Sequence, residues 1–263
     1  MSLLLFADDI VLIAENAKML QRMLDVVYQY SRKYRFKFNK EKSNVMIFGK
    51  HRRGKEDRYQ LGPSELQRVR SYKYLGLILD ENFSWKEHLE KICEKARKRT
   101  RALCGMGLRE GISAKGVLRG WEVLVRPVME YGAEIWGEKR WEKGEELQME
   151  TGRRTLGVSR MTTREVIQGE LGLEKISSRR ILLRLRLAMN KNRLVYKIYK
   201  QRREEFIKGK MKDKNNWCYW TWKFLKDIHL EHVWMSENME PGRNFNKLVK
   251  IYYESEKTNG ERK

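Results

Sequence analysis

Two adjacent aspartates near the N-terminus are the residues of this sequence best suited to chemistry. Asp8 and Asp9 lie between two short apolar runs, residues 3–7 and 10–14. This pattern predicts two strands joined by a tight turn, which would hold both carboxylates at the tip of a hairpin. Carboxylates bind Mg²⁺, and two of them can share divalent cations in phosphoryl transfer. The alternative interpretation of the Asp-Asp pair is a plain polar turn.

The segments after the hairpin predict a small sheet with one helix. Neither apolar run alternates with polar residues, so both faces of the hairpin are expected to be covered. Residues 15–34 carry apolar side chains at helical spacing and predict an amphipathic helix. The remaining expectations are short strands at 36–38 and 44–48, a charged loop at 49–64, and a strand region at 69–79 broken by Gly76.

From residue 84 onward the sequence predicts helices. Ser84 and Glu87 have the spacing of a capping box, which indicates a helix through Leu103. Ser113 is expected to cap a helix through Val128 that Pro127 kinks. A further helix is expected at 143–156, ending at Gly157. Thr162 and Glu165 repeat the capping-box spacing before a short helix that ends near Gly172. A basic helix at 178–208 and an apolar cluster within 217–225 are expected to follow.

The charge of the chain indicates an acidic partner. The 263 residues include 57 Lys or Arg and 35 Asp or Glu, a net charge of +22. Nucleic acid is the usual partner of such a protein, and a basic protein on a membrane surface is the alternative. No apolar run approaches the roughly 20 residues of a membrane span. Three scattered cysteines suit a reducing compartment, so we expect a nuclear or cytoplasmic, intracellular protein.

Several segments resemble reverse transcriptases of the non-LTR (LINE-type) retrotransposon group. Phe6-Ala7-Asp8-Asp9 resembles motif C, which carries metal ligands. Residues 38–46 resemble motif D, and residues 72–76 resemble motif E, the primer grip. Residues 84–103 and 124–132 look like the helical thumb, and segments 156–157 and 170–173 are similar to those that follow it. The resemblance covers roughly residues 3–190, and the order and spacing of its motifs make it specific.

The resemblance implies an α+β fold. A small antiparallel palm-remnant sheet with one helix would precede a helical thumb bundle and a basic helical C-terminal region. The expected divisions are 1–83, the C-terminal part of the palm; 84–157, the thumb; 158–210, a basic post-thumb segment; and 211–263, a C-terminal extension that is partly disordered.

The resemblance also implies roles for individual residues. Asp8 would be a metal ligand, and Asp9 would be the second carboxylate of the pair. Lys42 would be the motif D lysine that protonates the leaving pyrophosphate. A solvated loop lysine is the alternative for Lys42, because Lys40 lies two residues away.

The segment Tyr74, Leu75 and Gly76 would form the turn that holds the primer end. Core packing with a glycine turn is a compatible interpretation of these three residues. Packing suits Leu75 better than direct contact with the primer.

Basic helices are expected to bind RNA and DNA as primer and template. Cations along a helix can follow a phosphate backbone, although a solvated charged face is the alternative. Phosphate contacts of this kind do not read base sequence. The residues expected to bind nucleic acid are Lys95, Arg97, Lys98, Arg101, Arg179, Arg180, Arg184 and Arg186.

Reverse transcriptases also need motif A, motif B and the fingers, which precede motif C. Phe6 lies five residues after Met1, so we expect a truncated RNA-directed DNA polymerase that is inactive alone. Mg²⁺ is expected only if an upstream polymerase segment supplies the missing half of the palm. The alternatives are a non-enzymatic basic nucleic-acid-binding protein derived from a retroelement and, less favoured, an unrelated helical interaction module. No metal site is expected from His51, His88, His229 and His232.

Overall fold

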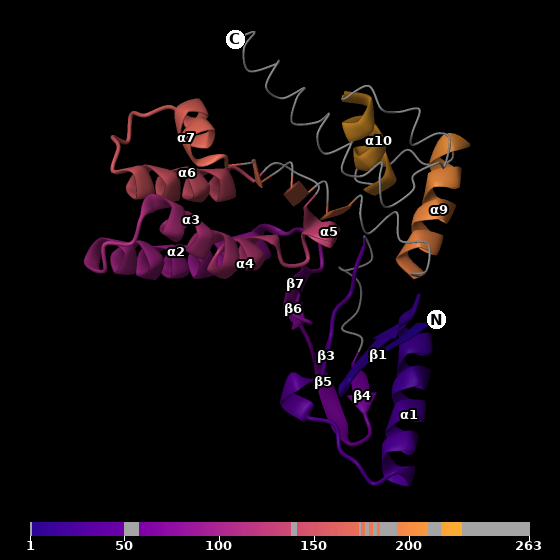
Figure 1. The fold of residues 1–263 in the computed structure, drawn as a ribbon. Coiled ribbons are helices and arrows are strands. Elements are labelled where there is room, and N and C mark those ends of the chain that lie inside the picture. The colour runs from indigo at the N-terminus through magenta and orange to yellow at the C-terminus, as the bar shows by residue number, and fades with distance from the viewer. Residues whose placement is uncertain are drawn as a thin grey trace. The chain divides into compact units, whose positions relative to one another are not determined.

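The computed structural model confirms the predicted α+β fold class: small sheets precede a mostly helical region (Figure 1). The chain divides into two compact units, Met1–Leu89 and Glu90–Lys263. The structure describes residues 2–49, 58–137, 141–173, 175–176, 179–180, 183–184, 194–209 and 217–227. Residues named above that lie outside these ranges are His51, Arg186, His229 and His232. Of the C-terminal extension 211–263, which was expected to be partly disordered, the structure describes only residues 217–227.

The first element is the predicted hairpin. Strand β1 (Ser2–Phe6) pairs antiparallel with β2 (Asp9–Ile13), and Phe6 lies opposite Asp9. Ala7 and Asp8 therefore form a two-residue turn, the shortest connection that two antiparallel strands use. The apolar runs and the polar pair between them predicted this hairpin correctly.

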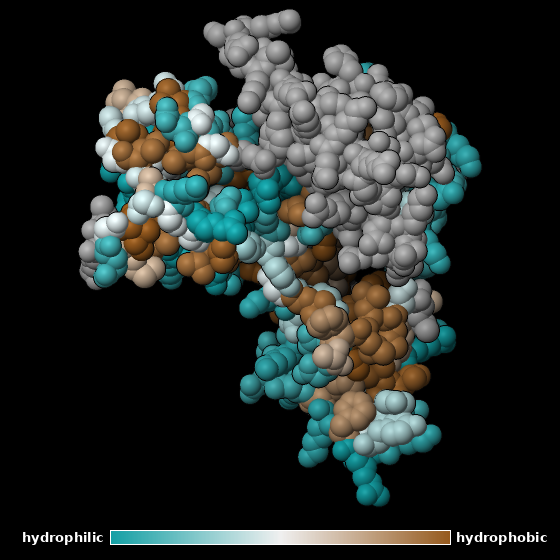
Figure 2. Space-filling view, viewed as in Figure 1, coloured by the Kyte–Doolittle hydropathy of each residue, from teal (hydrophilic) through white to brown (hydrophobic). Residues whose placement is uncertain are grey.

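The expectation that both faces of the hairpin are covered is wrong for the described residues. Leu3, Leu5 and Phe6 are 50%, 65% and 60% exposed. Among the described residues β1 and β2 form a two-stranded sheet, so no third strand covers either edge. Leu12 of β2 packs against the core of this unit. Figure 2 shows the resulting hydrophobic surface over the N-terminal unit.

Helix α1 (Ala17–Lys33) covers a small sheet. The Asn16 side chain caps it by accepting a hydrogen bond from the Met19 amide at 2.9 Å. Leu24 on α1 packs with residues of three strands, β3 (Asn44–Val45), β4 (Tyr59–Leu61) and β5 (Ser64–Arg68), in the order β3-β5-β4. The buried residues of this core are Leu24, Val45, Tyr59, Leu61 and Leu66.

Two local expectations in this region are wrong. Residues 36–38 form no strand, and the strand expected over 44–48 shortens to two residues. Residues 59–61 and 64–68 are strands where a loop was expected through 64. Burial of Tyr59 and Leu61 against the α1 core outweighs the loop composition, and Gly62-Pro63 is only the turn between β4 and β5. Residues 50–57 of the expected loop lie outside the described ranges.

The region expected to be one broken strand is a second hairpin. Strand β6 (Ser71–Tyr74) pairs antiparallel with β7 (Leu77–Asp80). The Asp80 carboxylate then accepts hydrogen bonds from the Asn82 and Ser84 amides at 2.8 and 3.3 Å. The Ser84 hydroxyl accepts from the Lys86 amide at 3.3 Å, two residues before the first residue of α2 (Lys86–Arg109). Ser84 thus bonds the start of the predicted helix, but through Lys86, whereas the expected capping box pairs Ser84 with Glu87.

Buried His88 ties the start of α2 to this hairpin. Its side chain is 3% exposed, and its Nδ1 accepts a hydrogen bond from the Ile78 amide at 3.3 Å. The imidazole nitrogen thus gives the buried Ile78 amide of β7 a hydrogen-bond acceptor.

Helices α2 to α7 build most of the second unit. After α2 come α3 (Ala114–Leu124), α4 (Arg126–Glu130), α5 (Ala133–Trp136), α6 (Glu142–Leu156) and α7 (Arg164–Leu171). Ser113 caps α3 as predicted. Pro127 lies in the first turn of α4, so the expected single kinked helix is two helices. Helices α6 and α7 end at Gly157 and Gly172, both left-handed, although Thr163 rather than Thr162 precedes α7.

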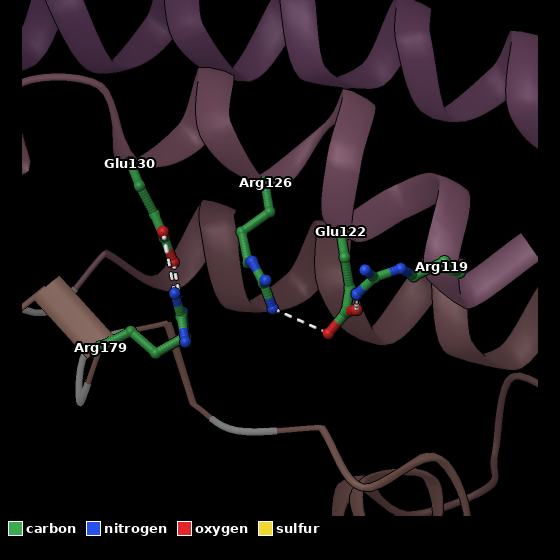
Figure 3. A network of polar contacts seen from close by, with 5 residues as sticks. All are labelled: Arg119, Glu122, Arg126, Glu130 and Arg179. Carbon is green, nitrogen blue, oxygen red and sulfur yellow. Dashed lines mark hydrogen bonds and ion pairs between the residues drawn. The ribbon is translucent and has the colours of Figure 1, made fainter. Parts of the chain in front are cut away.

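Charged side chains connect α3, α4 and the segment at residue 179 (Figure 3). Glu122 pairs with Arg119 at 3.2 Å and with Arg126 at 2.9 Å. Glu130 at the end of α4 pairs with Arg179 at 2.6 Å. The half-buried Glu130 pair joins residues 49 positions apart, whereas the Glu122 pairs are local.

The last described helices pack together. Helix α9 (Leu194–Ile207) buries Tyr199, and α10 (Trp217–Asp227) buries Cys218 and Leu225. The ring of Phe206 lies 5.7 Å from that of Trp222, so part of the expected apolar cluster is present. Helix α9 covers part of the expected basic helix, and residues 185–193 of that helix lie outside the described ranges. None of the described helices has the length and apolar character needed to cross a membrane.

The exposed β1–β2 hairpin is expected to be less stable than helix α2. Amides of β1 and β2 should exchange with solvent at least about a hundredfold faster than amides of α2 between Ile92 and Leu103, because local opening exposes little additional apolar surface. Hydrogen exchange followed by mass spectrometry or NMR measures this difference. Equal protection of the hairpin and of α2 would contradict it.

Candidate functional site

The candidate site is the tip of the β1–β2 hairpin. Asp8 occupies the second turn position and Asp9 is the first residue of β2, and both residues are exposed. Phe6 and Asp9 are register partners, so the two strands hold the aspartates at a defined position. Two neighbouring carboxylates are thus presented together to solvent at one end of an apolar hairpin.

The turn that carries the aspartates is strained at Ala7. Its φ is +52°, in the left-handed region, whereas Asp8 is not among the residues with positive φ. A positive φ at only the first central position is the signature of a type II′ turn, in which glycine is favoured. An alanine there costs roughly 1–2 kcal/mol, and such strain is found most often at functional sites.

Replacing Ala7 with glycine is expected to stabilise the hairpin. Glycine adopts positive φ without a Cβ clash, so Ala7→Gly should lower the free energy of the closed turn by about 1 kcal/mol. Amide exchange at Leu4 and Val11, which form the next hydrogen-bonded pair after Phe6 and Asp9, would then slow about fivefold. Ala17→Gly, at the first helical position of α1, provides a control with ordinary geometry. Unchanged or faster exchange in the Ala7 variant would contradict the assigned turn strain.

Two carboxylates alone make an incomplete metal site. Their oxygens suit Mg²⁺, which proteins commonly bind through one or two carboxylates together with substrate phosphates. Across the residues that the structure describes, no group of three or more His, Cys, Asp or Glu side chains could hold a metal ion. Asp8 and Asp9 therefore fit a divalent cation only as partial ligands, which substrate or another protein segment would have to complete.

Lys42 lies in a short 3₁₀ turn (Lys40–Lys42) and is exposed. The Asn39 side chain accepts hydrogen bonds from the Glu41 and Lys42 amides at 3.0 and 3.2 Å, which fixes the turn. The Tyr72 hydroxyl of β6 donates to the Lys42 carbonyl oxygen at 2.7 Å. Tyr72 belongs to the segment that resembles motif E, although the sequence predicted no role for it, and its hydroxyl joins this segment to the one that resembles motif D.

The Tyr74-Leu75-Gly76 segment forms the turn that was expected. Leu75 and Gly76 have φ values of +45° and +83° and connect β6 to β7. Two consecutive positive φ values define a type I′ turn, whose twist matches that of paired strands. Tyr74 and Leu75 are both half-buried, which agrees with a packing role for Leu75. Contact with a primer end stays a prediction.

Four of the predicted nucleic-acid-binding residues share one face of α2. Lys95, Arg97, Lys98 and Arg101 are all exposed. Lys98 pairs with Glu94 at 2.7 Å, and this contact holds the pKa of Glu94 below its usual value. The buried residues of the same helix lie on the opposite face at helical spacing and include Cys93, Ala96 and Leu103. This exposed basic face of α2 is accessible to a phosphate backbone.

The predicted residues near position 180 are not exposed in the same way. Arg180 and Arg184 are 1% and 4% exposed, and Arg179 pairs with Glu130. Arg180 and Arg184 are therefore buried in this structure, and their contact with a phosphate backbone stays a prediction. The sequence showed only helical spacing and charge, whereas burial depends on the residues that pack around each guanidinium group.

Arg180 is enclosed by aromatic rings. Its guanidinium carbon lies 5.2 Å from the ring of Trp136 and 5.8 Å from that of Trp141. Desolvation by burial lowers the pKa of Arg180 to about 10, against the opposing charges of Glu145 and Glu130. The group still carries its charge at neutral pH, and cation–π contact stabilises it inside the protein.

The three cysteines do not form a reactive site. Cys93, Cys104 and Cys218 are free and buried. Burial raises the pKa of the Cys218 thiol to about 12 and raises that of Cys104. A buried thiol with a raised pKa supplies little thiolate, so thiol chemistry is disfavoured at Cys104 and Cys218.

Comparison with known proteins identifies the N-terminal region. Residues 1–79 match the family model described as reverse transcriptase (RNA-dependent DNA polymerase). No curated protein and no solved structure matched the chain. The matched segment contains the Asp8–Asp9 hairpin, Lys42 and the Tyr74 turn, and it ends inside β7. Residues 1–79 of this chain therefore carry a reverse transcriptase domain.

Proposed function

We propose that residues 1–83 are the C-terminal part of the palm of a non-LTR retrotransposon reverse transcriptase. The observation that best supports this proposal is the position of Asp8 and Asp9. They lie at the tip of an antiparallel hairpin, within the segment that matches the reverse transcriptase family. Asp8 would be a metal ligand, Asp9 its partner, and Lys42 the proton donor to the leaving pyrophosphate. The reaction would add deoxynucleotides to a primer on an RNA template.

The proposal extends to the helices that follow. Residues 84–157 would be the thumb, and residues 158–210 a basic post-thumb segment. The exposed basic face of α2 supports this assignment, because Lys95, Arg97 and Arg101 can follow the backbone of a primer–template duplex. The turn at Tyr74, Leu75 and Gly76, which β7 separates from α2, would hold the primer end.

The 263-residue chain is proposed to be inactive alone. Its Asp8–Asp9 pair lacks a third acidic or histidine ligand among the described residues, and two-metal catalysis needs both ions held in position. The purified chain with Mg²⁺, deoxynucleotides and a primed RNA template should not extend the primer. Activity should follow when a non-LTR reverse transcriptase segment carrying the fingers and motifs A and B is joined before Ser2.

A non-enzymatic role in binding nucleic acid is the second candidate. The net charge of +22 and the incomplete carboxylate site favour it. Under this alternative the chain binds RNA or DNA, Asp8→Asn leaves the affinity unchanged, and joining the upstream segment restores no synthesis. Primer extension by the joined protein therefore separates the two candidates.

A further inference from the structure

Exposed aromatic rings and cations alternate where α1 ends. The rings are those of Tyr30, Tyr34 and Phe36, and the cations are those of Lys33, Arg35 and Lys37. We name these six residues the aromatic–basic surface. It lies in the N-terminal unit at the C-terminal end of α1 (Figure 1), and no role has been assigned to it above.

The rings form a continuous series. The ring centroids of Tyr30 and Tyr34 are 4.4 Å apart, and those of Tyr30 and Phe36 are 6.2 Å apart. Phe36 contacts Phe38 at 5.2 Å, and Phe38 packs against the core of the unit. The series is thus fixed to the core at one end and open to solvent at the other.

A left-handed residue brings the rings together. Arg35 has a φ of +58°, and the Phe36 amide donates to the Ser31 carbonyl oxygen at 3.1 Å. This is the hydrogen bond of a Schellman motif, whose left-handed position glycine usually occupies. The reversal at Arg35 returns Phe36 to the side of Tyr30 and leaves an additional cation beside the rings.

Exposure distinguishes these rings from a core cluster. Tyr30 and Tyr34 are 55% and 56% exposed and Phe36 is 39% exposed, although large aromatic rings normally gain by burial. Their surroundings are strongly basic, since residues 32–42 hold six Lys or Arg and one Glu. Figure 2 shows a largely hydrophilic surface at this end of α1. Partly exposed rings between cations suit a ligand with flat groups on an anionic backbone.

We propose that the aromatic–basic surface binds single-stranded nucleic acid. Unpaired bases would stack on the rings of Tyr30, Tyr34 and Phe36 while Lys33, Arg35 and Lys37 contact phosphates. Lys33 Nζ lies 5.4 Å from the Tyr34 ring centroid, and this flexible side chain can move to a phosphate when a base takes its place. Duplex bases are already stacked on each other, so the surface discriminates against duplex.

This inference rests on the nucleic-acid partner of the proposed function, but it concerns a site separate from the aspartates and from α2. Stacking on an aromatic ring tolerates any base, so the surface selects strand state and not sequence. In the proposed polymerase the bound nucleic acid would be a single-stranded part of the template or of the strand displaced from the template.

The test measures binding of the full chain to fluorescent 20-nucleotide poly(U) and poly(A) RNA and to a 20-base-pair RNA duplex. Tyr30→Ser/Tyr34→Ser should weaken single-strand binding about tenfold or more and change duplex binding by less than twofold. Tyr30→Trp/Tyr34→Trp should retain single-strand affinity, because stacking requires a ring and not a hydroxyl. Tyr131→Ser removes a ring with the same 55% exposure from the second unit and serves as the matched control.

Each outcome decides the proposal. Unchanged single-strand affinity in the serine variant, or an equal loss of single-strand and duplex binding, would overturn it. Equal competition by polyglutamate and by unlabelled single strands would show that the surface binds acidic polymers through charge alone and would also overturn it. If the parent chain binds neither form of RNA, the nucleic-acid part of the proposed function fails as well, whereas duplex binding without a tyrosine effect removes this inference only.

Discussion

Asp8→Asn is expected to reduce primer extension at least about a thousandfold in the chain joined to an upstream reverse transcriptase segment. Asparagine keeps the size of the side chain and one oxygen but removes the charge that binds a divalent cation. Charge stabilisation by a catalytic metal is worth several kcal/mol, and each 1.36 kcal/mol changes the rate tenfold. Steady-state incorporation of labelled deoxynucleotides on a primed RNA template measures the loss.

Asp25→Asn is the matched control for this experiment. Asp25 is an exposed aspartate of α1 that accepts a hydrogen bond from the Gln21 side chain at 2.8 Å, within the same unit. Its substitution should change extension by less than twofold. Asp9→Asn should cost less than Asp8→Asn, because Asp9 is proposed as the secondary carboxylate. Full activity in the Asp8 variant would remove the metal-ligand assignment and with it the polymerase proposal.

Neutralising the basic face of α2 is expected to reduce the salt dependence of nucleic-acid binding. Each cation that neutralises a phosphate of duplex DNA contributes about 0.9 to the slope of log affinity against log salt. Lys95→Gln/Arg101→Gln in the full chain should therefore lower that slope by about 1.8 and weaken binding uniformly across sequences. Fluorescence anisotropy between 50 and 200 mM salt, a range in which such contacts change affinity by orders of magnitude, measures both quantities.

Lys115→Gln/Lys143→Gln controls for the loss of two charges. Both lysines are exposed on other helices of the second unit, α3 and α6. If net charge alone determines binding, the two double variants will behave alike, which contradicts a specific role for α2. If the salt-dependence slope is unchanged in the α2 variant but lower in the control, the phosphate contacts lie outside the basic face of α2.

The elements that sequence predicted correctly are those built from local signals. Ser113 caps α3 by accepting a hydrogen bond from the Gly116 amide, three residues further along the chain. Gly157 ends α6 because glycine alone adopts its left-handed conformation without strain. The β1–β2 hairpin needs only two apolar runs and a two-residue turn, so Asp8 and Asp9 could be placed at its tip without further information.

Tertiary contacts decided what these local signals could not. Residues 59–61 have the composition of a loop, yet they form a strand because Tyr59 and Leu61 are buried against the α1 core. The Gln60 backbone also exchanges hydrogen bonds of 3.0 and 2.9 Å with the Gln21 side chain, 39 residues away. The sequence predicted Arg180 to be an exposed cation, yet it is buried against Trp136 and Trp141. Burial of a charge depends on which rings surround it, and a local pattern holds no such information.

The sequence by itself determined the hairpin that holds the aspartates, the helices with their caps, and the excess of positive charge. The tertiary structure alone decided which cations face solvent, since Lys95 and Arg101 are exposed and Arg180 and Arg184 are not. The physical reason is that turns and caps depend on atoms a few residues apart, whereas exposure of a side chain depends on every segment that packs around it.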